Sequence, residues 1–253
     1  MLKGLLRDVR VMAWAAGAAV LVVAGPVAAK PVAAPTGALP HVAQRVASGL
    51  PLRIVAFGSS STQGAGASSP AATYPARLLV FLRAALPVPV EVANAGIGGQ
   101  DADDMLRRLP AVTAGHPDLV IWQTGSNDPL RDVPLDRFER ETRAGITAFR
   151  AAGIDVMLME PQYCAVLGAR AGGYDYRDRL RVIAAQMRVP LIRRYDLMRT
   201  WLAEGLLTPA QLLTGDGLHM GDGGYAHLAD AVARQIVNLA GLHPRPQFAT
   251  TDR

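Results

Sequence analysis

Between residues 52 and 239, short apolar segments alternate with longer segments of helical character, and this alternation restricts the fold more than any other feature of the sequence. The apolar segments are nearly continuous, and several end at a glycine or a proline. Segments of this kind are typical of strands that are buried on both faces. The predicted strands cover residues 52–58, 90–96, 117–125, 154–161 and 189–195.

The segments between these strands favour helices, most clearly at residues 74–86, where apolar residues recur at helical spacing. Further helices are predicted over residues 101–112, 135–153, 174–188 and 222–238. Strands that alternate with helices form a parallel sheet with helices on both faces. We therefore predict an α/β domain over residues 51–241, a flavodoxin-like three-layer α/β/α sandwich around a five-stranded parallel sheet.

Residues 1–29 have the order of a secretory signal. A short basic segment, residues 1–10, precedes an uncharged apolar segment, residues 11–25, and Val27 and Ala29 occupy the small-residue positions before a cleavage site. The alternative is an uncleaved anchor, because the apolar segment is nearly long enough to span a bilayer and would tether the protein to the membrane. In both cases we expect a periplasmic or secreted domain.

The segments that flank the domain lack clear periodicity. Residues 30–50 are rich in proline and alanine and predict an extended tether with at most one short helical turn. Residues 242–253 are polar and contain proline, so we expect a flexible tail.

Composition excludes several kinds of chemistry. The only cysteine, Cys164, rules out an intramolecular disulfide and a thiolate metal cluster. The only lysines, Lys3 and Lys30, precede the first predicted strand, so the domain has no lysine for a Schiff base or a phosphate-binding loop. The net charge of +5 comes mainly from arginines scattered among carboxylates, which gives nucleic-acid binding little support.

Polar or glycine-rich segments follow each of the first four predicted strands. In a parallel α/β sheet, binding and catalytic sites form beyond the carboxyl ends of the strands, so these loops are expected to converge. The relevant segments are Gly58–Thr62, Asn94–Gly99, Gly125–Asp128 and Glu160–Tyr163, together with Asp216–His219 before the last helix.

His219 is the best candidate for a general base among the five histidines. It lies in a predicted loop, and Asp216 precedes it by three residues, so a short loop can present an imidazole and a carboxylate together. The carboxylate would then fix the ring tautomer and stabilise the imidazolium that forms. His227 falls within the last predicted helix, and His116 at the opposite end of the third strand, which makes both poor candidates.

A serine that transfers acyl groups also needs donors for an oxyanion. Gly99 follows the second predicted strand, where a bare backbone N–H can approach a substrate, and Asn127 follows the third strand with a side-chain amide. The backbone N–H of the nucleophilic serine itself would be a third donor.

These segments, taken in order, resemble the SGNH, or GDSL-type, hydrolases. That family has a Gly-Asp-Ser-x-x-x-Gly block after its first strand, a glycine block after the second, a Gly-x-Asn-Asp block after the third and an Asp-x-x-His block near the end. The resemblance covers roughly residues 52–239 and implies Ser60 as nucleophile, His219 as base and Asp216 as the acid that orients it. It also implies that the N–H groups of Ser60 and Gly99 and the amide of Asn127 bind the oxyanion.

One position departs from the family pattern. Ser59 stands where the family has an aspartate directly before the nucleophile. This residue is not the triad acid, so the chemistry should survive, but the rigidity of the nucleophile loop is called into question.

The resemblance implies a serine esterase that forms an acyl-enzyme and needs no metal or organic cofactor, with short-chain acyl esters as the expected substrates. An O-acyltransferase or deacetylase acting on an envelope or plant polysaccharide would use the same residues, and a non-catalytic binding domain is a third alternative. Gln162 and Tyr163, just past the fourth predicted strand, are candidates to line the substrate pocket. The expected partner is therefore a small-molecule or polysaccharide ester.

Overall fold

The computed structural model describes residues 38–242, which form a five-stranded, wholly parallel sheet in the order β2-β1-β3-β4-β5. The edge strand β2 pairs with β1 in register from Leu52↔Val90 to Gly58↔Gly96. The sheet consists of β1 (Leu52–Gly58), β2 (Val90–Gly96), β3 (Leu119–Gln123), β4 (Asp155–Met159) and β5 (Leu191–Ile192). This architecture confirms the predicted fold class.

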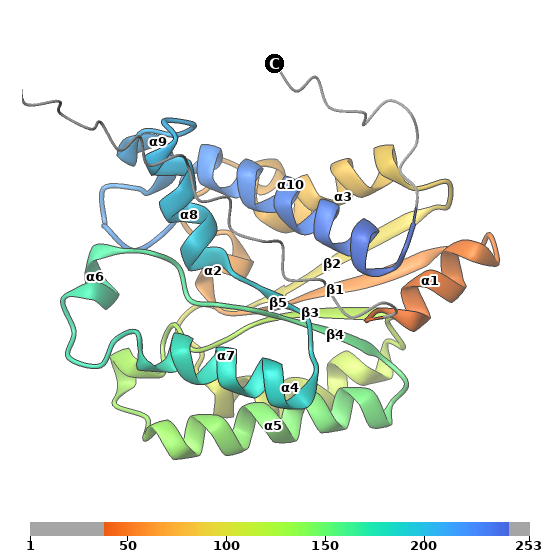
Figure 1. Ribbon diagram of the computed structural model, residues 1–253, viewed down its shortest axis with the longest axis horizontal. Helices are drawn as coiled ribbons and strands as arrows, with labels where there is room; N and C mark the ends of the chain where they lie inside the picture. Colours follow the sequence, from red (N-terminus) through yellow and green to blue (C-terminus); the bar gives the residue numbers. More distant parts are fainter. Residues whose placement is uncertain (1–37, 243–253) are drawn as a thin grey trace, which may run out of the picture. The chain divides into compact units, whose positions relative to one another are not determined.

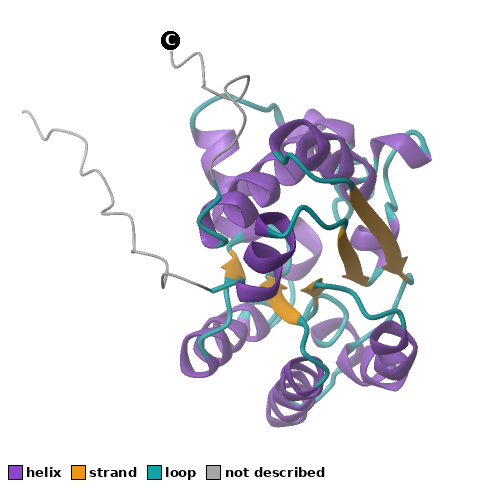
Figure 2. Cartoon of the chain, turned by 90° about the vertical axis from the view of Figure 1, so that its right-hand side faces the viewer, coloured by secondary structure: helices purple, strands orange, loops and turns teal. Residues whose placement is uncertain are grey.

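Helices cover both faces of the sheet (Figures 1 and 2). One face packs against α1 (Pro40–Ala47), α3 (Tyr74–Ala85), α8 (Arg194–Ala203) and α10 (Asp222–Leu239). Apolar residues at alternate positions of the strands, such as Ile54 and Ile121, point into this layer and are fully buried.

The opposite face packs against α4 (Ala102–Ala114), α5 (Leu135–Ala151) and α7 (Asp175–Met187). Its core contains an aromatic cluster of Phe57, Trp122 and Phe149, with ring centroids about 6 Å apart. Gly145 allows the indole to lie against α5, because a Cβ at this position would be 2.5 Å from two Trp122 ring atoms.

The fifth strand is shorter than predicted. Residues 189–195 were expected to form it, but only Leu191 and Ile192 pair with β4, and α8 begins at Arg194. The side chain of Arg194 is fully buried, so the chain turns here to place the guanidinium inside the domain rather than to extend an edge strand.

The second half of the expected tether also differs from an extended segment. Pro40–Ala47 form helix α1, in which Val42 is fully buried against the core. The Val42 N–H donates to Asp155 Oδ2 at 3.0 Å, and His41 Nδ1 lies 2.8 Å from Asp155 Oδ1. This short helix packs its apolar side on the core and is part of the domain. The domain therefore begins before residue 51, which was the predicted start. The signal segment, the first part of the tether and residues 243–253 of the tail lie outside the described residues.

Short elements occupy the carboxyl edge of the sheet, the edge at which all five strands end. They are α2 (Ser60–Gln63), η1 (Pro70–Ala72), η2 (Pro129–Arg131), α6 (Ala165–Gly168) and α9 (Pro209–Leu212). None of the helices within residues 38–242 is both long and apolar enough to cross a membrane.

Candidate active site

Ser60 lies at the carboxyl edge of the sheet as the first residue of α2, directly after the turn that ends β1. Two glycines let α2 lie close to the strands. A Cβ on Gly96 would be 2.1 Å from the Gln63 backbone nitrogen, and a Cβ on Gly58 would be 2.4 Å from Thr62 Oγ1. Larger residues at these positions would push α2 away and displace the serine.

The structure brings Ser60, His219 and Asp216 together. His219 Nε2 lies 2.9 Å from the Ser60 hydroxyl oxygen, although 159 residues separate them in sequence. The other ring nitrogen, Nδ1, lies 2.6 Å from Asp216 Oδ2. A neutral imidazole that donates its Nδ1 proton to the carboxylate leaves Nε2 as the acceptor of the serine proton.

The carboxylate of Asp216 is held by its own loop. Its Oδ1 accepts hydrogen bonds from the Thr214 hydroxyl at 2.8 Å and from the N–H groups of Leu218 and His219 at 2.9 Å. Desolvation raises the pKa of Asp216, but these hydrogen bonds and the one from the His219 ring outweigh it and hold the pKa well below its ordinary value. The carboxylate therefore stays charged at neutral pH and keeps the imidazole oriented.

The glycine turn after β2 lies beside the serine. A Cβ on Gly98 would be 3.8 Å from the Ser60 Cβ, and the adjacent Gly99 has φ 76°, a left-handed conformation that favours glycine. Among the hydrogen bonds found within residues 38–242, none uses the N–H of Ser60 or Gly99. Asn127 Nδ2 donates one hydrogen to the Gln100 carbonyl at 2.8 Å and has a second hydrogen to offer.

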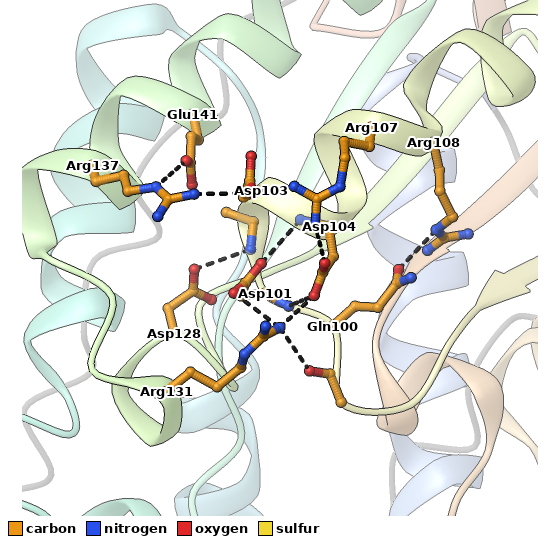
Figure 3. Close-up of polar contacts among 12 residues, drawn as sticks. Gln100, Asp101, Asp103, Asp104, Arg107, Arg108, Asp128, Arg131, Arg137 and Glu141 are labelled. Carbon is orange, nitrogen blue, oxygen red and sulfur yellow. Dashed lines mark hydrogen bonds and ion pairs between the residues drawn. The ribbon is translucent and has the colours of Figure 1, made fainter.

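A polar network joins the loop after β2 to the loop after β3 (Figure 3). Arg131 forms ion pairs with Asp101 at 2.9 Å and with Asp104, both at the start of α4. Asp128 Oδ1 accepts a hydrogen bond from the Ala102 N–H at 3.0 Å. These contacts fix the two loops that carry Gly99 and Asn127 relative to each other.

The side chain of Gln123, at the end of β3, forms hydrogen bonds with the residues on either side of the nucleophile. Its Oε1 accepts hydrogen bonds from the Ser59 N–H and hydroxyl, both at 2.9 Å, and from the Ser61 hydroxyl at 3.2 Å. Its Nε2 donates to Ser126 Oγ at 3.1 Å. All four residues are buried. The nucleophile loop is therefore anchored to β3 although Ser59 carries no charge.

The two residues expected to line the substrate pocket have different positions. Tyr163 is 36% exposed, and its ring packs edge-on against Tyr195. Gln162 is only 2% exposed, and both ends of its amide bond to protein groups. Gln162 thus lies beneath the surface rather than on the wall of a pocket. The reason is that both its amide oxygen and its amide nitrogen form hydrogen bonds with other protein groups.

Sequence reasoning missed the roles of Gln123 and Arg194. Both side chains are completely buried, and both interrupt segments that are otherwise apolar and predicted as strands. A polar group buried inside a sheet needs hydrogen-bond partners, so these interruptions were the available signal.

A serine hydroxyl, an imidazole and a carboxylate bonded in series above the carboxyl edge of a parallel sheet define a serine hydrolase. The model of the Non-GDSL lipase-like family matches residues 26–241. The chain belongs to this family, and it is an SGNH-type serine hydrolase, a class that acts on ester bonds.

Individual proteins agree with this assignment. The chain is 28% identical to an arylesterase of Vibrio mimicus over 149 residues, which are 58% of this chain and 70% of the relative. It is 29% identical to thioesterase 1/protease 1/lysophospholipase L1 of Escherichia coli (strain K12) over 151 residues, 58% of this chain and 68% of the relative. Its fold is similar to that of a two-domain esterase active on acetylated mannans, with a TM-score of 0.68, 22% identity, and coverage of 83% of this chain and 56% of the other.

Proposed function

We propose that this protein is an exported esterase that hydrolyses short-chain carboxylic esters through an acyl-enzyme. The observation that carries the proposal is the series Ser60 Oγ, His219 Nε2 and Asp216 Oδ2, linked at 2.9 and 2.6 Å. A serine hydroxyl is a weak nucleophile until an adjacent base removes its proton, and this geometry provides that base.

In the acylation step, Ser60 Oγ attacks the carbonyl carbon of the ester while His219 Nε2 takes the hydroxyl proton. The negative charge that develops on the carbonyl oxygen is stabilised by the N–H groups of Ser60 and Gly99 and by the amide of Asn127. His219 then donates its proton to the leaving alcohol, and the bond between the acyl carbon and the alcohol oxygen breaks.

In the deacylation step, His219 removes a proton from water, which attacks the acyl-enzyme. The carboxylic acid leaves as Ser60 recovers its proton from the imidazolium. Asp216 accepts the Nδ1 hydrogen bond throughout and stabilises the positive charge on the ring in both steps.

The short acyl group is supported by the acetylated substrate of the similar mannan esterase. Export is supported by the order of basic, apolar and small residues within residues 1–29. A fractionation of cells that express the full chain, with immunodetection of the cytoplasmic, periplasmic and medium fractions, tests export. Recovery of the protein only in the cytoplasm would refute it.

The proposed activity is tested with a fluorophosphonate probe and nitrophenyl esters from acetate to palmitate. We expect wild type to be labelled and to prefer acetate or butyrate, while Ser60→Ala takes up no label and loses activity by at least about 10⁴-fold. A wild-type protein that neither labels nor hydrolyses any ester would indicate a binding domain. A preference for palmitate would contradict the short-chain assignment.

A polysaccharide ester is a second candidate substrate, with either water or a sugar as the acyl acceptor. The partly exposed ring of Tyr163 favours it, since aromatic faces stack on the apolar faces of sugars, and so does the mannan substrate of the similar esterase. Product analysis with acetylated xylan or mannan decides between these outcomes. Free acetate indicates hydrolysis, and acetyl transfer to an added oligosaccharide indicates a transferase.

A further inference from the structure

Arg194 is a fully buried arginine that has only uncharged hydrogen-bond acceptors. Its Nε donates to the Glu160 backbone carbonyl at 2.8 Å, its Nη1 to Ser61 Oγ at 2.9 Å and its Nη2 to Gln162 Oε1 at 2.7 Å. The carboxylate of Glu160 forms hydrogen bonds with Arg181, and among the described contacts none joins it to Arg194.

A buried guanidinium without a carboxylate partner is costly. Removing a charge from water costs several kcal/mol in a real protein, by order of magnitude, and neutral acceptors recover only part of this free energy. Burial also lowers the pKa of Arg194 to about 10, which still leaves the group charged at neutral pH. An apolar residue would fill the same space at lower cost, so stability alone does not account for the arginine.

Gln162 extends the contacts of Arg194 toward the catalytic histidine. Its Oε1 accepts hydrogen bonds from Arg194 and, at 3.1 Å, from Ser126 Oγ, and its Nε2 donates to the Leu218 carbonyl at 3.2 Å. Leu218 directly precedes His219 in the loop that carries the base. Ser126 directly precedes Asn127, which is expected to bind the oxyanion.

A continuous chain of hydrogen bonds thus runs from Ser61 through Arg194 and Gln162 to Leu218. Its two ends are the residue after the nucleophile and the residue before the base. The catalytic side chains themselves join the two loops through the bond between Ser60 and His219, and this bond must break and reform during each turnover.

We infer that Arg194 and Gln162 are positioning residues, which hold the Ser60 loop and the His219 loop at a fixed separation while the proton moves between the two side chains. This inference rests on the proposed function. Neither residue touches the reacting atoms. Their effect is geometric, since a displacement of about 1 Å between reacting groups lowers a rate by about 100-fold.

The variant Gln162→Glu tests this inference selectively. A carboxylate of the same shape keeps an acceptor for Arg194 and gives it a charge partner, but it replaces the donor to the Leu218 carbonyl by an oxygen that repels it. We expect kcat for nitrophenyl acetate, and the rate constant of fluorophosphonate labelling, to fall by about 10- to 100-fold, with KM changed less than threefold.

Gln235→Glu is the matched control. Gln235 Nε2 also donates to a backbone carbonyl, that of Leu191, at the same distance of 3.2 Å. It lies about 20 Å along α10 from the first residue of that helix, Asp222. This variant should keep wild-type kcat and KM. The midpoint of thermal unfolding, measured for both variants, separates loss of position from loss of folded protein.

The outcomes are distinct. A fall in kcat for Gln162→Glu at an unchanged unfolding midpoint supports the inference, whereas an unchanged kcat, or a fall that the folded fraction explains, overturns it. If Gln162→Glu does not fold, Ser61→Ala removes the other end of this hydrogen-bond series with little change in side-chain volume. An unchanged kcat in that variant would also overturn the inference. Wild type without esterase activity would instead refute the proposed function.

Discussion

The Ser59 hydroxyl donates a hydrogen bond to Gln123 Oε1 at 2.9 Å, and the backbone N–H of the same serine reaches the same oxygen. The residue that stands in place of the family aspartate is therefore tied to the end of β3 through a neutral amide. The nucleophile loop depends on Gln123 for its position, and the loss of charge at residue 59 leaves no unpaired group behind.

Replacing Gln123 by leucine should destabilise the protein and impair catalysis. The change removes the shared acceptor of Ser59 and Ser61, and buried donors without a partner cost about 1–3 kcal/mol each. We expect urea denaturation to show a decrease of about 2–4 kcal/mol in the free energy of unfolding. The control Gln235→Leu loses one partly buried hydrogen bond, and it should cost about 1 kcal/mol. Equal losses in the two variants would contradict the role of Gln123 as an anchor.

Asp216→Asn should lower kcat by about 10³- to 10⁴-fold while the protein stays folded. The amide oxygen of asparagine can still accept the hydrogen bonds that Oδ1 receives from Leu218 and His219, so the loop should keep its shape. The amide NH₂, however, faces Nδ1 and favours the tautomer with its proton on Nε2, which cannot accept the serine proton. Steady-state kinetics and far-UV circular dichroism test both parts, and a loss below tenfold would argue against the orienting role.

Gly96→Ala should impair both stability and catalysis. The new Cβ would meet backbone atoms of Gln63 and Thr62 at 2.1 to 2.6 Å, so α2 and its serine must move. We expect a loss of about 3 kcal/mol in the free energy of unfolding and a fall in kcat of at least about 100-fold.

The control for that variant is Gly145→Ala on the opposite face of the sheet. Its Cβ would meet the Trp122 ring at 2.5 Å, which should cost a similar 1–3 kcal/mol, by order of magnitude, without moving the serine. Activity per folded molecule should stay within twofold of wild type. If both alanine variants lose activity to the same degree, the close approach of β2 to α2 is not specific to catalysis.

Asp128 should make the stability of the protein fall as pH rises. Burial raises its pKa to about 7, against the opposing hydrogen bond from Ala102, and Oδ2 has no partner among the described residues. Because the pKa is raised on folding, this group contributes its full stabilisation below the unfolded pKa of about 4, and the contribution is lost as pH rises through 7. The expected loss is about 1 kcal/mol per pH unit between pH 5 and 7.

Urea denaturation of wild type and Asp128→Asn at pH 5, 6, 7 and 8 measures this contribution. The slope with pH should be smaller in Asp128→Asn, which cannot ionise, and unchanged in Asp132→Asn, whose side chain is 86% exposed. A wild-type slope that persists in Asp128→Asn would show that another group is responsible.

The local pattern of residues was sufficient to place most elements. The strands Leu52–Gly58 and Val90–Gly96 have the predicted bounds, because each is a short segment rich in apolar residues that ends at a glycine. Local pattern was misleading at two places. Residues 40–47 were expected in a tether but form a helix. An eight-residue helix is stable only when its apolar side packs on a core, and the local sequence does not show that core. The fifth strand ends early because Arg194 turns inward to partners in α2 and in the loop after β4.

The sequence was enough to predict a parallel α/β sheet, because hydrophobic period and turn chemistry are local properties. It was also enough to identify Ser60, Asp216 and His219 as candidates, because the loops of such a sheet converge at the carboxyl ends of its strands. Only the tertiary structure decided that Gln123 binds Ser59 and Ser61, and that hydrogen bonds of Arg194 and Gln162 run from Ser61 to Leu218. Those contacts join residues up to 133 positions apart. Hydrogen bonds over such separations depend on distances and directions that no local pattern encodes.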